Sequence, residues 1–185
     1  MPTNPKVSAR LQESQIPAMS VPPSPIRPTD DAARTLALSL LRDARFAALA
    51  VTDPSGAGPM ISRVALTLTL SGAPMTLISS LAAHSAALRA DPRAALLVGE
   101  PGARGDPLTH PRLSLRATAR FVDRDSAEHQ TLRAHYLTQR PKAALYADFA
   151  DFSFVVFSAT GAALNGGFGK AFILTPEDLQ PPPGR

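Results

Sequence analysis

Serine and histidine side chains gather in one short stretch of this sequence, at the point where an apolar run gives way to a predicted helix. Ser79 and Ser80 precede the helix, and His84 and Ser85 lie within its first turns. The beginning of a helix offers unpaired backbone N–H groups and a partial positive charge, which together favour an anion. Residues 78–85 therefore predict a phosphate site. A serine that only caps the helix explains the same pattern.

Arginine is the second residue type that indicates an anion. Arg63 lies in a predicted strand close to the serine-rich turn, and arginine can hold a phosphate through two parallel hydrogen bonds. Farther along, residues 112–121 alternate strictly, with apolar side chains on one side and polar ones, including Arg112, on the other. This alternation predicts a strand with one buried face and one face toward solvent, a ligand or a second subunit.

The elements that position these residues follow from hydrophobic periodicity and turn signals. Helices are predicted over residues 29–44, 82–90 and 126–139, with a further short helix through Tyr146. Strands are predicted over residues 46–52, 59–70, 75–79, 94–99, 112–121, 151–158 and 170–174. Several strands in meander order with two or three helices favour a mainly β (α+β) fold built on a small antiparallel barrel.

Length and proline content define the expected organisation. The chain has 185 residues, enough for one domain of ordinary size. Seven of its 19 prolines fall in residues 1–28, which we expect to be a disordered or extended arm. The folded domain is predicted over residues 29–179, and residues 180–185 are predicted to be a flexible tail.

Composition excludes several classes of function. The chain has no cysteine, which rules out disulfides, thiolate metal sites and a cysteine nucleophile. The net charge is +4, but the arginines are scattered singly, so no nucleic-acid surface is predicted. The sequence shows neither a signal peptide nor an apolar run of about 18 residues, so we expect a cytoplasmic protein without a membrane span.

The remaining histidines give no metal site. His129 and His135 are six residues apart on one predicted helix, so they do not share a face, and both are predicted to lie at the surface. His110 lies in a proline-rich loop, where it makes either a turn hydrogen bond or a contact in a cleft.

Four stretches, in this order and spacing, resemble the FMN-binding split barrels related to pyridoxamine 5'-phosphate oxidase, and in particular their haem-utilisation subfamily. They are residues 59–66, 77–98, 106–113 and 166–171. The resemblance implies a six-stranded antiparallel split β-barrel with flanking helices. It also implies a homodimer that holds FMN at the subunit interface and acts as an oxidoreductase on a small-molecule substrate. It assigns no catalytic side chain.

The resemblance implies ten cofactor-binding residues: Arg63, Val64, Ala65, Ser79, Ser80, His84, Ser85, Arg112, Asn165 and Lys170. The first three would line the flavin, and the serines and His84 would hold its phosphate. His84 stands where the oxidases carry a lysine. Nothing like the oxidases' substrate-binding arginine–histidine–arginine group follows Lys170. A haem-binding protein without flavin chemistry and a non-catalytic dimer are therefore the alternatives.

Overall fold

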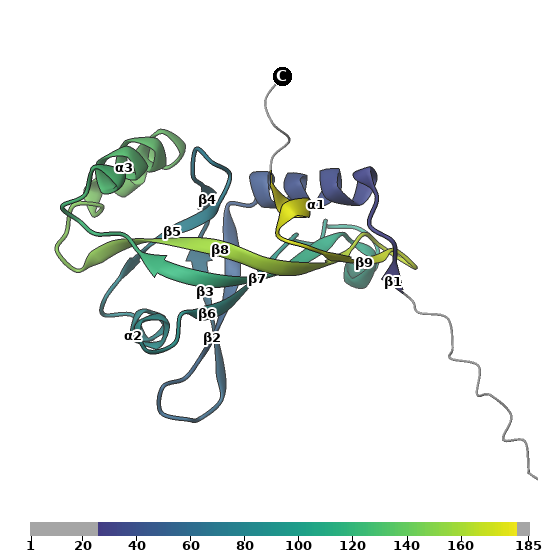
Figure 1. Cartoon of the computed structure of the whole chain (residues 1–185), viewed down its shortest axis with the longest axis horizontal. Helices are drawn as coiled ribbons and strands as arrows, with labels where there is room; N and C mark the ends of the chain where they lie inside the picture. The colour runs from purple at the N-terminus through teal and green to yellow at the C-terminus, as the bar shows by residue number, and fades with distance from the viewer. Residues whose placement is uncertain (1–25, 181–185) are drawn as a thin grey trace, which may run out of the picture.

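Capping side chains begin two of the three α-helices near their predicted starts. The computed structural model describes residues 26–180 (Figure 1). Helix α1 spans Asp31–Asp43, and the Asp30 carboxylate accepts a hydrogen bond from the Ala33 N–H at 2.7 Å. Helix α2 spans Ala83–Ala90, and α3 spans Ala127–Gln139. Three short 3-10 helices are η1 (Pro107–Thr109), η2 (Pro141–Leu145) and η3 (Glu177–Leu179).

Nine strands form one sheet in the described part of the chain. They are β1 (Ile26–Arg27), β2 (Phe46–Thr52), β3 (Pro59–Ala65), β4 (Thr67–Leu68), β5 (Pro74–Ser79), β6 (Arg93–Val98), β7 (Arg112–Phe121), β8 (Phe152–Asn165) and β9 (Ala171–Leu174). The main path runs β1-β9-β8-β7-β6-β2-β3, and β5 pairs with β4 and β8. Every pair is antiparallel except β1 with β9. The predicted class, mainly β with flanking helices, is confirmed, although more strands form than the six expected.

Strand β7 shows how the sequence pattern becomes a core. Leu113, Leu115, Ala117 and Ala119 are all buried, while the residues between them are exposed, as the alternation predicts. The buried row belongs to the main core, which also takes in apolar side chains of α1 and α2. A second, smaller core lies under α3, where Tyr136 packs edge-on against a phenylalanine of β8.

Two predicted strands have different bounds in the structure. The single strand predicted over residues 59–70 is wrong, because the chain breaks between β3 and β4 at Leu66. The Leu66 N–H donates to the Arg45 carbonyl at 3.1 Å, and β4 then pairs with β5 instead of β2. The strand predicted over residues 151–158 is too short, since β8 continues to Asn165 past an irregularity in its pairing with β7.

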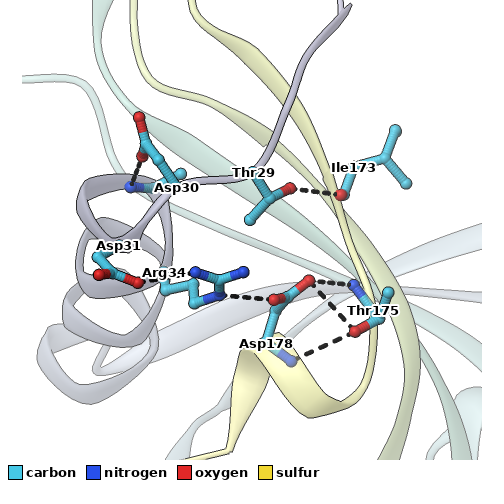
Figure 2. Close-up of polar contacts among 8 residues, drawn as sticks. Thr29, Asp30, Asp31, Arg34, Ile173, Thr175 and Asp178 are labelled. Atoms are coloured by element: carbon cyan, nitrogen blue, oxygen red, sulfur yellow. Dashed lines mark hydrogen bonds and ion pairs between the residues drawn. The ribbon is translucent and has the colours of Figure 1, made fainter.

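The two ends of the described fold are fastened to each other. Ile26 and Arg27, which the prediction placed in the arm, form β1 against β9. The Thr29 hydroxyl donates to the Ile173 carbonyl at 2.8 Å, and Arg34 Nε lies 2.6 Å from Asp178 Oδ1 (Figure 2). Residues 1–25 of the predicted arm and 181–185 of the predicted tail lie outside the described residues.

One face of the sheet is turned away from the core. Its central row crosses six strands in register: Arg63, Ala48, Leu97, Ser114, Ala163 and Ile173. Five of these six residues are exposed, and Ala48 is partly buried. Two positions along β3, Ile61 is 73% exposed. We call this surface, with Ile61, the outer face.

Candidate functional site

A single cavity of about 200 Å³ brings Arg63 and Arg112 together. Arg63 comes from β3 and Arg112 from the first position of β7, so residues 49 positions apart in sequence line the same space. Apolar residues and the loop after β6 complete the walls: Phe46, Ala48, Leu97, Val98, Gly99, Glu100, Pro101, Pro107 and His110. We call this cavity the arginine cleft.

Both arginines of the arginine cleft are held by neutral groups. The Arg63 guanidinium lies over the Phe46 ring, 4.9 Å from its centre. Arg112 Nη1 donates to the Leu108 carbonyl at 2.9 Å and to the His110 carbonyl at 3.5 Å. No ion pair engages either guanidinium within residues 26–180, although Glu100 is exposed on the same wall. The cleft therefore holds two guanidinium charges that no carboxylate of residues 26–180 neutralises by direct contact.

The loop between β6 and β7 is closed by His110. The Gly102 N–H donates to His110 Nδ1 at 3.2 Å, so the proton of the neutral ring is on Nε2, which donates to the Arg104 carbonyl at 2.9 Å. At the base of the loop, Gly99 has φ +100°, and a Cβ there would come within 2.5 Å of the Pro111 carbonyl oxygen. Glycine is required at this position because the two ends of the loop touch.

The serine-rich turn is largely satisfied by the protein itself. The Ser79 hydroxyl donates to Asp151 Oδ2 at 2.5 Å and accepts from the Leu81 N–H. The Ser85 hydroxyl is buried and donates to the Ser79 carbonyl at 2.6 Å. Two of the three hydroxyls are thus used internally, and the Asp151 carboxylate adds negative charge beside them. No hydrogen bond or ion pair of the described residues joins Arg63 to this turn.

His84 and Ser80 are the two side chains of the turn that keep free polar atoms. Ser80 is exposed, and its hydroxyl makes no hydrogen bond within the described residues. His84 Nε2 is buried without a partner, and burial lowers the pKa of the imidazole below its usual value. A neutral imidazole is a weaker partner for phosphate than the lysine that the resemblance leads one to expect.

The other predicted site residues lie at the edges of the arginine cleft or apart from it. The Val64 side chain is buried in the main core, and Ala65 pairs with Phe46. Asn165 pairs with Arg112 in the sheet, and its Oδ1 accepts from the Gly167 N–H at 3.0 Å. Lys170 is exposed after the glycine-rich turn, and it is not among the residues that line the cleft.

Sequence reasoning missed Phe46 and Glu100 as cleft residues, because neither belongs to a chemical motif. Their only signal was their position: Phe46 begins a predicted strand, and Glu100 is the first residue after one. The surface prediction for His129 is wrong, since its ring is buried edge-on against Phe154 at 5.3 Å between centres. None of the helices in residues 26–180 is both long and apolar enough to cross a membrane.

An open, almost wholly antiparallel sheet wrapped by three helices defines a split-barrel protein. Comparison with known families agrees with this class. The sequence model of a family described as pyridoxamine 5'-phosphate oxidase matches residues 35–165, and the chain belongs to this family.

Similar proteins include several that are named for haem. The non-canonical heme oxygenase HOZ of Arabidopsis thaliana chloroplasts is 33% identical over 117 residues, 62% of this chain. The match spans 34% of that relative, about a third of its length. The structure of a heme binding protein from Mycobacterium smegmatis is 30% identical, with a TM-score of 0.72 over 83% of this chain and 61% of that one.

A third protein is similar to this chain in fold only. The heme storage protein HutZ from Vibrio cholerae is 19% identical, with a TM-score of 0.56 over 69% of this chain and 87% of that one. Together these comparisons confirm the predicted resemblance to split barrels related to pyridoxamine 5'-phosphate oxidase, with relatives in haem utilisation.

Proposed function

We propose that this chain binds haem in the arginine cleft. One observation carries the proposal: Arg63 and Arg112 line the same partly apolar cavity, and neither has a carboxylate partner within the described residues. Haem combines a flat apolar ring with two carboxylates. Guanidinium groups hold carboxylates through paired hydrogen bonds, and apolar walls such as Phe46 and Leu97 suit the ring. The two relatives of at least 30% identity described above are named for haem.

A second copy of the chain completes the cleft in this proposal. One chain encloses about 200 Å³, whereas small-molecule sites usually enclose roughly 300–1,000 Å³. The arginine cleft opens beside the outer face, since Arg63, Ala48 and Leu97 belong to both. A homodimer formed through this face would cover exposed apolar side chains and supply the missing wall.

The residues of the chain then have separate tasks. Arg63 and Arg112 bind the carboxylates, while the loop closed by His110 forms a wall. His110 does not ligate iron in this arrangement, because both of its ring nitrogens are bonded within the loop. The iron of haem supplies redox chemistry when haem is bound.

Haemin titration of the purified chain tests the proposal. We expect a saturable Soret shift with one haem per chain. Replacing both arginines, Arg63→Gln with Arg112→Gln, should weaken binding by at least about tenfold, since each loses a charge-assisted hydrogen bond. Arg27→Gln with Arg89→Gln is the matched control, because it removes the same two charges at residues that do not line the arginine cleft. An unshifted Soret band, or equal losses in the control, would overturn the proposal.

FMN is the second candidate ligand, and one observation favours it. His84 Nε2 is a buried nitrogen without a partner in the turn where the family resemblance implies the flavin phosphate. Bound FMN would make the chain an oxidoreductase acting on a small-molecule substrate, as that resemblance implies. Quenching of FMN fluorescence on addition of the chain, weakened by His84→Gln, would support this candidate. Absence of quenching at micromolar protein would remove it.

A further inference from the structure

A second cavity gathers arginines away from the arginine cleft. It has a volume of about 180 Å³ and lies among the end of α1, the break between β3 and β4, and the end of α3. Its wall includes three arginines, one threonine and one glutamine: Arg42, Arg45, Arg140, Thr67 and Gln139. We call it the α1–α3 cavity. No residue of its wall is acidic.

The charge of the α1–α3 cavity is only partly balanced. Arg42 Nε lies 3.2 Å from the Asp43 carboxylate, and both side chains are well exposed. Neither Arg45 nor Arg140 forms an ion pair with any described residue. Two guanidiniums at one small cavity without a carboxylate repel each other, so an anion between them lowers the free energy of the folded state.

Backbone carbonyls fix the position of Arg140. Its Nη2 donates to the Leu66 carbonyl at 2.8 Å and to the Arg45 carbonyl. Both carbonyls belong to residues that line the cavity, so the guanidinium is held in place before a ligand arrives. A fixed guanidinium loses little conformational entropy on binding.

Two donors beside the cavity are buried without a hydrogen-bond partner among residues 26–180. They are Arg140 Nε and the hydroxyl of Thr67, whose residue is only 5% exposed. Buried polar groups are nearly always hydrogen-bonded in native proteins, so an unpaired donor indicates a water, an ion or a ligand. The guanidinium nitrogen can only donate, so an incoming ligand must offer acceptors.

From these observations we infer that the α1–α3 cavity is a binding site for a small oxyanion of the phosphate or carboxylate class. Acceptor oxygens match the unpaired donors, and negative charge matches Arg45 and Arg140. The cavity is far larger than the roughly 15 Å³ that one water requires, so it has room for a ligand of several atoms. A metal cation is excluded by the three arginines, and an apolar ligand would leave the buried donors unpaired.

Titration of the full chain with inorganic phosphate, and separately with succinate, tests the inference. Both titrations are followed by calorimetry and by the NMR signals of arginine Nε–H groups at constant ionic strength. We expect saturable binding of at least one of these anions that shifts the Arg140 signal. Tighter binding of phosphate would assign the phosphate class, and tighter binding of succinate would assign the carboxylate class.

Two variants and one control locate the site. Arg45→Gln should weaken binding at least about tenfold, because one charge-assisted interaction is lost. Thr67→Val should weaken it as well, and it retains the fold because the lost hydroxyl has no partner. Arg89→Gln, which removes the same charge at a residue that lines neither cavity, is the matched control and should bind normally. Absence of saturable binding that shifts the Arg140 signal, or an equal effect of Arg45→Gln and Arg89→Gln, would overturn the inference.

Discussion

The arginines of the described residues differ in the groups that their guanidiniums contact. Several are engaged by carboxylates, as in the pairs of Arg93 with Asp91 and Arg120 with Glu128. Arg63 and Arg112 are instead held by a ring and by carbonyls, which leaves their charge for a ligand. The sequence indicated Arg112 through the alternation of its strand, and Arg63 through a predicted strand close to the serine-rich turn.

The serines of the turn show that the hydrogen-bond partner of a single side chain cannot be predicted from the local sequence. Ser79 and Ser85 fit a phosphate site by type and spacing. In the structure, however, the Ser79 hydroxyl is bonded to Asp151, which is 72 residues away in sequence. No local pattern distinguishes a hydroxyl that is free for a ligand from one that a distant carboxylate engages.

Tyr136 provides a test of a buried hydroxyl. The residue has no exposed surface, its hydroxyl has no hydrogen-bond partner in the described part of the chain, and burial raises the pKa of the phenol to about 12. Tyr136→Phe should leave the free energy of unfolding unchanged or raise it by up to about 1 kcal/mol, because an unsatisfied polar group leaves the core. Urea denaturation measures this change. A loss of stability would show that the hydroxyl has a partner.

His84 provides a test of pH dependence. Burial lowers the pKa of its imidazole in the folded state, so below about 6.5 the unfolded chain binds the proton more readily. This contribution to stability is complete above that pH and is lost as the pH falls below it. The urea midpoint of the native chain should therefore drop more steeply between pH 7 and pH 5 than that of His84→Gln. Equal slopes would contradict the prediction.

At the scale of elements, the sequence predicted the interiors of strands and helices more accurately than the breaks between them. The alternation of β7 and the cap of α1 are local signals, and both elements form as predicted. The break between β3 and β4 depends on Leu66, whose carbonyl accepts from Arg140 and whose N–H donates to Arg45. These contacts join residues 74 and 21 positions apart, so periodicity along residues 59–70 could not reveal them.

Gly99 tests how tightly the loop of the arginine cleft is closed. Gly99→Ala should lower the free energy of unfolding by at least about 2 kcal/mol, because alanine is strained at φ +100° and its Cβ meets the Pro111 carbonyl. Gly58→Ala is the matched control, with φ +111° and open space around the new Cβ, and should cost about 1 kcal/mol. Equal losses in the two variants would show that contact with Pro111 adds nothing.

At the scale of the whole molecule, the outer face is the interface of the homodimer that we propose. Exposed Ile61, Leu97 and Ile173 lie on one surface of the sheet, where a second copy would cover them. Ile61→Glu should convert a dimer into a monomer and weaken haem binding with it, because a buried unpaired carboxylate is costly. Light scattering and haemin titration measure the two effects together.

Leu70 supplies the control for this substitution. It is 73% exposed, as Ile61 is, but it lies in the turn between β4 and β5 and not on the outer face. Leu70→Glu should therefore leave the dimer intact. A native chain that is monomeric at micromolar concentration, or an Ile61→Glu variant that stays dimeric, would contradict an interface at this face.

Because the two ends of the described fold contact each other, the order of the elements along the chain can be changed by circular permutation. Strand β1 lies beside β9, the Thr29 hydroxyl donates to the Ile173 carbonyl of β9, and Arg34 of α1 forms an ion pair with Asp178 of η3 (Figure 2). A circularly permuted chain, with a short linker from residue 180 to residue 26 and new termini in the exposed turn 53–58, should keep the same fold. The architecture would then be independent of where synthesis begins.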